Sequence, residues 1–149
     1  MNLTVQMANI RISEVKSLLY KKITEIQKKR MDFRMEVMYP VDETGMKPLD
    51  LSRALGILLD NAIEETEKTG GKISLVVSRQ QDAVHIIVEN TIEREVDLAR
   101  IYEEGYSTKG SGRGNGLTGL RRILQKYPGA SLMTECENGM FIQRLAIMR

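Results

Sequence analysis

The sequence predicts an α+β fold, a two-layer α/β sandwich in which helices pack against a largely antiparallel sheet. The first observation is the order of the expected elements, which runs helix, strand, helix, two strands, loop, helix, two strands. The second is residues 51–68, where apolar residues recur with the period of an α-helix. The third is Asn138-Gly139, a strong signal for a tight turn between strands expected at residues 131–136 and 140–148.

The composition is that of one soluble globular domain. The chain has 149 residues, of which 42% are hydrophobic and 28% charged, which fits a single domain with its own core. A net charge of +2, with basic and acidic residues interleaved, argues against a nucleic-acid partner. Cys136 stands alone, which excludes an internal disulfide and a cysteine metal cluster. Since no apolar run approaches ~20 residues and no signal-peptide pattern opens the sequence, we expect a soluble, cytoplasmic protein.

Residues 10–30 carry an amphipathic helical pattern. The apolar positions on its face are Ile12, Val15, Leu19, Ile23 and Ile26. Such a helix can be the end of a coiled coil or bundle, or it can pack on its own domain, and the sequence favours neither. Residues 31–39 then alternate as a strand, residues 40–48 form a loop, and Asp50 is the expected N-cap of the next helix.

The helix expected at residues 51–68 has two distinct faces. The apolar face consists of Leu51, Ala54, Leu55, Leu58, Leu59, Ala62 and Ile63. The opposite face consists of Arg53, Ile57, Asp60 and Glu64. Because each residue turns the helix by about 100°, Asn61 falls on the border between the two faces.

Two more strands are expected at residues 72–79 and 83–90, joined by a short polar turn. One face of the second strand consists of Val84, Ile86, Val88 and Asn90. His85 points to the opposite face, because successive side chains of a strand alternate. If the apolar face meets the helices, Asn90 lies at the mouth between the sheet and the helix layer.

Residues 105–120 form a glycine-rich stretch, with six glycines among sixteen residues. A helical pattern at residues 117–127 follows at once. A loop of this kind before a helix offers unpaired N–H groups and the positive end of the helix dipole, which favours a phosphate. Lys109 and Arg113 add positive charge. The alternative, a disordered linker, is disfavoured because the helical pattern resumes immediately.

Three motifs resemble those of a known family. Residues 58–64, Leu-Leu-Asp-Asn-Ala-Ile-Glu, resemble the N-box of the GHKL ATPase superfamily. Residues 112–117 resemble its second glycine box, Gly-x-Gly-x-Gly-Leu, and residues 104–109 look like the segment before that box in histidine kinases. The resemblance covers about residues 31–149 and is greatest to the peptide-pheromone quorum-sensing sensor kinases of the AgrC and ComD type. It implies the Bergerat ATP-binding fold, preceded here by an N-terminal helix.

The resemblance implies that ATP and Mg²⁺ are bound, and it assigns roles to single residues. Asn61 would hold the Mg²⁺ that bridges the ATP phosphates, and the alternative is a helix asparagine that only borders the core. Glu64 would hydrogen-bond a water of the Mg²⁺, or it is an exposed, salt-bridging glutamate. The residues implied at the phosphates and in a lid over the nucleotide are Lys109, Gly112, Gly114, Gly116 and Leu117.

Two departures from the family pattern bear on function. Histidine kinases usually carry an Asp-x-Gly-x-Gly motif, whose Asp accepts a hydrogen bond from the adenine amino group. Asn90 stands in that place here and can still accept through its amide oxygen. ATP-hydrolysing members place a glutamate one turn before the N-box asparagine, where this chain has Ile57, which cannot act as a base. A kinase whose acceptor is a histidine needs no such base, so the kinase interpretation is favoured.

The resemblance further implies a fragment of a larger kinase. The only histidine, His85, is expected to be a structural or surface residue, whereas the acceptor of such kinases lies on a dimerisation domain. Residues 1–30 match the end of that domain, and residues 31–149 match the catalytic domain. The expected partners are a dimerisation-domain histidine and a response regulator, and the expected full-length protein is a membrane-bound homodimer with this domain in the cytoplasm. The alternatives are a kinase of the anti-sigma-factor type and a non-catalytic signalling module.

Overall fold

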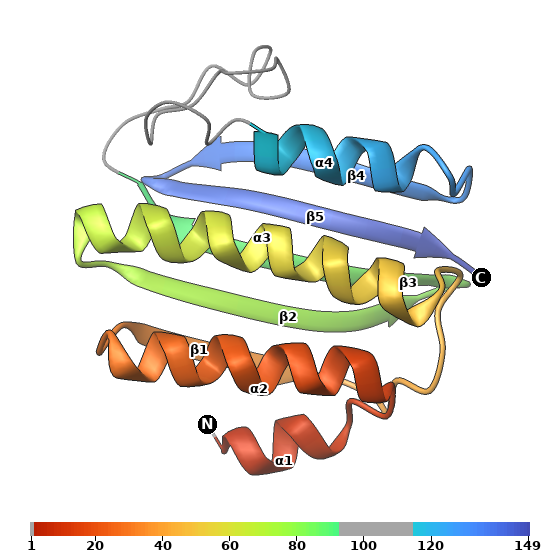
Figure 1. Ribbon diagram of the computed structural model, residues 1–149, viewed down its shortest axis with the longest axis horizontal. Helices are drawn as coiled ribbons and strands as arrows, with labels where there is room; N and C mark the ends of the chain where they lie inside the picture. Colours follow the sequence, from red (N-terminus) through yellow and green to blue (C-terminus); the bar gives the residue numbers. More distant parts are fainter. Residues whose placement is uncertain (1, 93–114) are drawn as a thin grey trace.

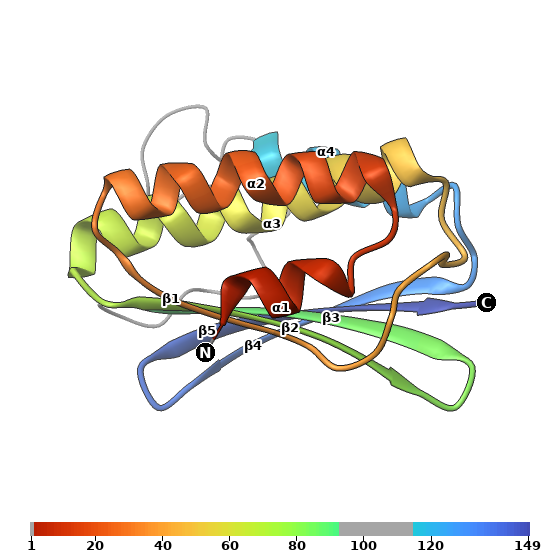
Figure 2. The ribbon, with the colours of Figure 1, turned by 90° about the horizontal axis from the view of Figure 1, so that it is seen from below.

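The computed structural model describes residues 2–92 and 115–149. Its helices are α1 (Leu3–Ala8), α2 (Ser13–Lys28), α3 (Pro48–Thr69) and α4 (Asn115–Leu124). Its strands are β1 (Asp32–Val37), β2 (Lys72–Gln80), β3 (Ala83–Thr91), β4 (Ala130–Glu137) and β5 (Met140–Met148). Figures 1 and 2 show α2, α3 and α4 side by side on one face of the sheet, with α1 beside β1.

The sheet has five strands in the order β1-β2-β3-β5-β4. β1 and β2 are parallel, and the other neighbouring strands described are antiparallel. A parallel pair needs a crossover connection, which α3 supplies. Asn138 and Gly139 have φ values of 52° and 77°, the left-handed conformation that a tight hairpin turn requires. The predicted two-layer sandwich with a largely antiparallel mixed sheet is confirmed.

The N-terminal segment differs from the single helix predicted at residues 10–30, because α1 and α2 are separated by a short extended segment. In this segment the N–H of Arg11 donates to the C=O of Val41 (2.9 Å), and the N–H of Val41 donates to the C=O of Asn9 (2.7 Å). These backbone groups pair with a distant part of the chain and are therefore not used in a helix.

α2 packs on the core of the domain. Its buried residues are Val15, Leu19, Ile23 and Ile26. Leu19 and Ile26 are 0% exposed, and they belong to the same apolar cluster as the buried face of α3. This is one of the two arrangements that the sequence left open. The assignment of residues 1–30 to the end of a dimerisation domain stays a prediction.

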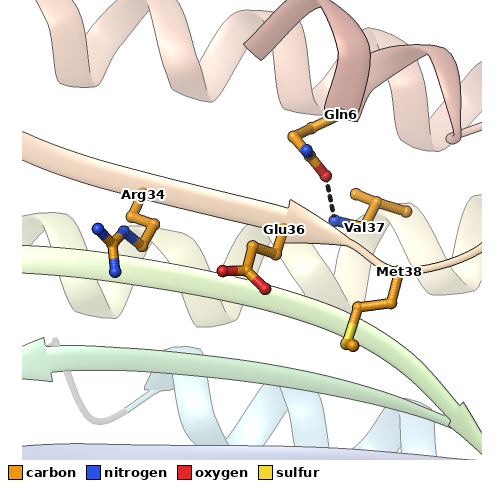
Figure 3. A pocket seen from close by; sticks show the side chains of 5 residues that line it. All are labelled: Gln6, Arg34, Glu36, Val37 and Met38. Atoms are coloured by element: carbon orange, nitrogen blue, oxygen red, sulfur yellow. Dashed lines mark hydrogen bonds between the residues drawn. The ribbon is translucent and has the colours of Figure 1, made fainter. Parts of the chain in front are cut away.

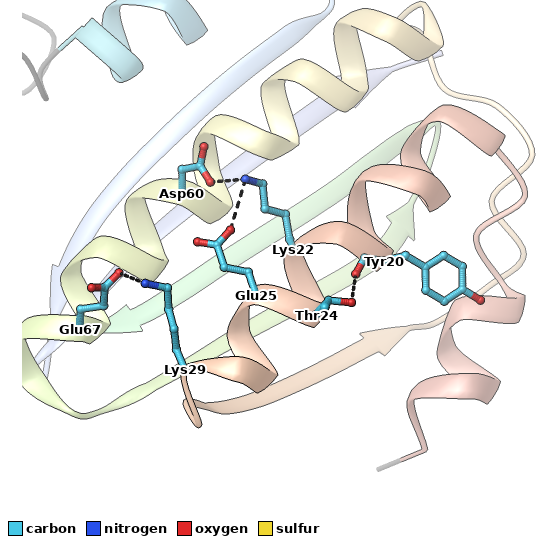
Figure 4. A network of polar contacts seen from close by, with 7 residues as sticks. All are labelled: Tyr20, Lys22, Thr24, Glu25, Lys29, Asp60 and Glu67. Carbon is cyan, nitrogen blue, oxygen red and sulfur yellow. Dashed lines mark hydrogen bonds and ion pairs between the residues drawn. The ribbon is translucent and has the colours of Figure 1, made fainter.

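Ion pairs join the exposed sides of α2 and α3 (Figure 4). The Lys22 ammonium lies 2.5 Å from the Asp60 carboxylate and 3.8 Å from that of Glu25. The Lys29 ammonium lies 2.9 Å from the Glu67 carboxylate. Because these acidic partners reach solvent, each pair contributes about 0–1 kcal/mol to stability. Apolar packing between the helices therefore dominates their association.

α1 is attached to β1, the strand at one edge of the sheet (Figure 3). The N–H of Val37 donates to the side-chain oxygen of Gln6 (2.7 Å), and the side-chain amide of Asn9 donates to the C=O of Val37 (2.9 Å). These bonds occupy backbone groups that an edge strand would otherwise leave open. A hollow of about 470 Å³ beside this contact is lined by Gln6, Arg34, Glu36, Val37 and Met38.

The start of α3 corrects the expected N-cap. Lys47 is the N-cap residue and Pro48 the first helical residue, so Asp50 lies inside the first turn. The Asp50 carboxylate accepts a short hydrogen bond from the Tyr127 hydroxyl and lies 3.4 Å from the Lys126 ammonium. These contacts connect the first turn of α3 to the chain just after α4.

Replacing Tyr127 with phenylalanine should therefore make stability depend less on pH. The Tyr127 hydroxyl, followed by the Lys126 ammonium, lowers the pKa of Asp50 from 3.8, and the same bond to Asp50 raises the pKa of Tyr127 from 10.0. A lowered carboxyl pKa stabilises the fold above pH 3.8, and this stabilisation is lost as the pH falls through the folded value. A raised tyrosine pKa stabilises the fold below pH 10.0 and is lost as the pH rises through the folded value.

We expect Tyr127→Phe to melt below the wild type at neutral pH, and we expect the gap to narrow below pH 3.8 in thermal unfolding followed by circular dichroism. Tyr20→Phe is the matched control, because Tyr20 is 56% exposed. A gap that is the same at every pH would contradict this role of the pair.

Candidate functional site

Asn61 lies on α3 close to the start of α4. It is 9% exposed, at the edge of the buried face, where the sequence placed it. One turn earlier, Ile57 faces α4, because a Cβ built on Gly116 or on Gly119 would lie 3.9 Å from the Ile57 side chain. The first turn of α4, which contains Gly116, therefore lies beside the α3 residue one turn before Asn61.

Asn90 lies on the face of β3 that meets the helices. It is 2% exposed, and it follows the buried Val84, Ile86 and Val88 in the alternation of that strand. This is the position predicted from the sequence. It is near the end of β3, and its backbone neighbours across the sheet are Ile73 and Phe141.

One hydrogen bond fixes the orientation of the Asn90 amide. Its side-chain nitrogen donates to the C=O of Thr91 over 3.0 Å. A carbonyl only accepts, so the nitrogen must face Thr91 and the amide oxygen must point elsewhere. Asn90 therefore offers an acceptor, which is the group that the adenine amino group needs.

A further polar residue on this face of the sheet was not identified as a site residue from the sequence. Gln143 of β5 is 2% exposed, although it lies in a strand whose other inward residues are apolar. The alternation between Phe141 and Leu145 already places position 143 inward. A polar residue at an inward position of a strand was the signal that could have found it.

The remaining predicted site residues are only partly described. Lys109, Gly112 and Gly114 lie outside the described residues. Gly116 lies in the first turn of α4, and Leu117 is partly buried against the core. The half-buried Glu64 lies on α3, three residues after Asn61. The roles of all these residues stay predictions.

His85 occupies the other face of the sheet. It is half-buried in β3 and pairs with Ser78 and Ala146 in the neighbouring strands. The buried residues before and after it in the strand face the helices, so its side chain points away from Asn61 and Asn90. The predicted placement of His85 away from the helix layer is confirmed.

The donor chemistry at Asn61 fits Mg²⁺. A carboxamide oxygen is a hard ligand, and Mg²⁺ usually takes one or two protein oxygens and completes its shell with phosphates and waters. Within residues 2–92 and 115–149 no three His, Cys, Asp or Glu side chains are grouped to hold a metal by themselves. At Asn61 the phosphates of a nucleotide and water would complete the shell of the ion. Among the same residues, no helix is long and apolar enough to cross a membrane.

Comparison with known proteins identifies the class. The model of the GHKL domain family matches residues 46–148, so the chain belongs to this family. The sensor histidine kinase DcuS of Escherichia coli K12 is 33% identical over 98 residues, which are 62% of this chain and 18% of DcuS. The chain thus spans under a fifth of the length of that relative.

Solved structures show the same fold. The catalytic domain of histidine kinase ThkA superposes with a TM-score of 0.76 at 22% identity, covering 91% of this chain and 90% of ThkA. The mycobacterial sensor histidine kinase MprB gives a TM-score of 0.68 at 14% identity, with 89% and 92% covered. Full-length ShkA in complex with AMPPNP gives 0.67 at 19% identity, with 92% of this chain and 30% of ShkA covered. The fold of the chain is that of histidine-kinase catalytic domains.

Proposed function

We propose that this chain is the ATP-binding catalytic domain of a two-component sensor histidine kinase. It would orient ATP so that the γ-phosphoryl group reaches a histidine on a dimerisation helix. The observation that carries the proposal is the pair of buried amides, Asn61 on α3 and Asn90 on β3. Both lie within the residues that match the GHKL domain, Asn61 in the segment that resembles the N-box and Asn90 where the resemblance expects an aspartate. The similarity to DcuS supports the same activity.

In this proposal, different residues bind the two ends of ATP, the base and the phosphates. At the base, Asn90 offers an amide oxygen whose orientation is fixed by Thr91. At the phosphates, Asn61 would hold Mg²⁺, which when bound neutralises the phosphate charge. Catalysis of phosphoryl transfer rests mainly on such positioning and charge neutralisation, so no protein base is needed for an acceptor that is itself a nucleophile. Ile57 fits this scheme, because it packs towards α4 and provides no base for water.

The proposal extends to partners that the chain itself does not contain. We infer a response regulator as the final phosphate acceptor, and a homodimeric, membrane-anchored receptor as the full-length protein. A ThkA structure in complex with the response regulator TrrA supports the first inference by analogy. The resemblance of about residues 31–149 to the pheromone-responsive kinases supports a peptide signal.

A second candidate is a non-catalytic signalling module. Asn90 favours this candidate. In most histidine kinases an aspartate at this place is a charged acceptor for the adenine amino group, and the asparagine is a neutral one. A neutral acceptor contributes about 0.5–1.5 kcal/mol, against about 1.5–3 kcal/mol for a charged one. A module of this kind would keep the fold and bind ATP weakly or not at all.

Two measurements on the full chain test the proposal. Calorimetric titration should show binding of ATP that depends on Mg²⁺, and incubation with γ-phosphate-labelled ATP should leave no acid-labile label on the chain, because its one histidine lies away from the site. Label should appear on the dimerisation domain of the same kinase when that domain is added. Absence of ATP binding would favour the non-catalytic module, and acid-labile label on the isolated chain would contradict the assignment of the acceptor.

A further inference from the structure

Gln143 carries a buried donor that the fold does not use. Among the residues that the structure describes, its side-chain nitrogen is buried and has no hydrogen-bond partner. Buried polar groups in proteins are nearly always hydrogen-bonded, because desolvation without a partner is unfavourable. The inward position between Phe141 and Leu145 would suit an apolar residue, so the glutamine weakens the core unless it binds something.

The sheet places this donor next to Asn90. β3 and β5 are antiparallel neighbours, in which Asn90 pairs with Phe141 and Val88 pairs with Gln143. Gln143 is therefore the diagonal neighbour of Asn90 on the same face, at a separation that long side chains can span. β5 runs between α3 and α4 in the view onto the helix layer (Figure 1), so this face lies beneath the line where the two helices meet.

The two amides present complementary groups to one ligand edge. Asn90 is held as an acceptor by its bond to Thr91, and Gln143 has a donor without a partner in the described part of the chain. An amino group beside a ring nitrogen, as on adenine, offers the matching donor and acceptor. Guanine presents a carbonyl where adenine has the amino group, and the fixed oxygen of Asn90 would face it without a proton between them.

We propose that Gln143 reads the base of the nucleotide, donating from its side-chain nitrogen to a ring nitrogen beside the adenine amino group while Asn90 accepts from that amino group. This inference rests on the proposed function and adds a specificity-determining residue to it. It also gives a reason for a glutamine at this inward position, because the nucleotide supplies the partner that residues 2–92 and 115–149 lack.

The test compares ATP, 1-deaza-ATP and 7-deaza-ATP, titrated with Mg²⁺ into the full-chain wild type and into Gln143→Leu. Loss of one neutral hydrogen bond should weaken ATP binding by Gln143→Leu about two- to tenfold. The wild type should bind one of the two deaza analogues as weakly as the variant binds ATP, and the variant should not distinguish that analogue from ATP. The melting temperature of the variant without nucleotide should equal or exceed that of the wild type, because leucine removes the unpaired donor.

Two further variants make the result specific. Gln143→Glu has nearly the same shape but only acceptors when ionised, so it should weaken ATP binding at least as much as Gln143→Leu. Gln125→Leu, at an exposed position, should change neither affinity nor selectivity. If the wild type bound ATP and both analogues equally, the proposed role of Gln143 would be overturned, but the proposed function would not. A wild type that binds none of the three would overturn the proposed function itself.

Discussion

Asn61→Ala is expected to abolish Mg²⁺-dependent ATP binding while the domain stays folded. Loss of even an outer-shell partner of a metal lowers affinity about 10–100-fold, so loss of the one proposed protein ligand should lower it at least that much. The helix should persist because alanine has the highest helix propensity, and Asn61 lies at the edge of the buried face and not in its centre. Calorimetric titration with and without Mg²⁺, together with thermal unfolding, measures both effects.

Two matched variants separate the metal role from a packing role. Asn61→Asp keeps a hard oxygen at the same place and should retain Mg²⁺-dependent binding. Asp60→Ala changes the neighbouring, exposed residue and breaks its ion pair with Lys22, so ATP binding should be unaffected. Unchanged affinity of Asn61→Ala for Mg-ATP, at a normal melting temperature, would reject Asn61 as the ligand.

Leu19→Ala should destabilise the whole domain by about 2–5 kcal/mol, the usual effect of truncating a fully buried leucine. Leu19 is 0% exposed on α2 and belongs to the same apolar cluster as the residues of α3. The melting temperature should fall by about 2–4 °C for each kcal/mol in a domain of this size. Thermal and urea unfolding should still show a single transition, because α2 and α3 share one core.

The neighbouring Tyr20 provides the control, since it is 56% exposed and Tyr20→Ala should change stability little. Leu58→Ala, at a 0% exposed position on α3, should destabilise the domain about as much as Leu19→Ala. If Leu19→Ala left unfolding unchanged, α2 would be separable from the catalytic domain. That outcome would favour the prediction that residues 1–30 belong to a dimerisation domain.

Local patterns were enough to predict most of the elements and their inward faces, although they did not predict α1. The residues of the predicted apolar stripe of α3, from Leu51 to Ile63, are all buried. Likewise, Asn90 lies on the inner face of β3 and Asn138-Gly139 forms the tight turn. These features follow from the helix and strand periods and from backbone preferences, which depend on neighbours in the sequence and need no tertiary information.

The tertiary structure decided the features that depend on distant partners. Asp50 looked like an N-cap from its neighbours, yet its carboxylate binds Tyr127, 77 residues away in the sequence. The helix expected from residue 10 is replaced there by an extended segment that pairs with Val41. Gln143 could be placed inward by alternation, but only the pairing of β5 with β3 puts it beside Asn90. Strand order and long-range contacts are set by the packing of the whole core, and no local period of the sequence encodes them.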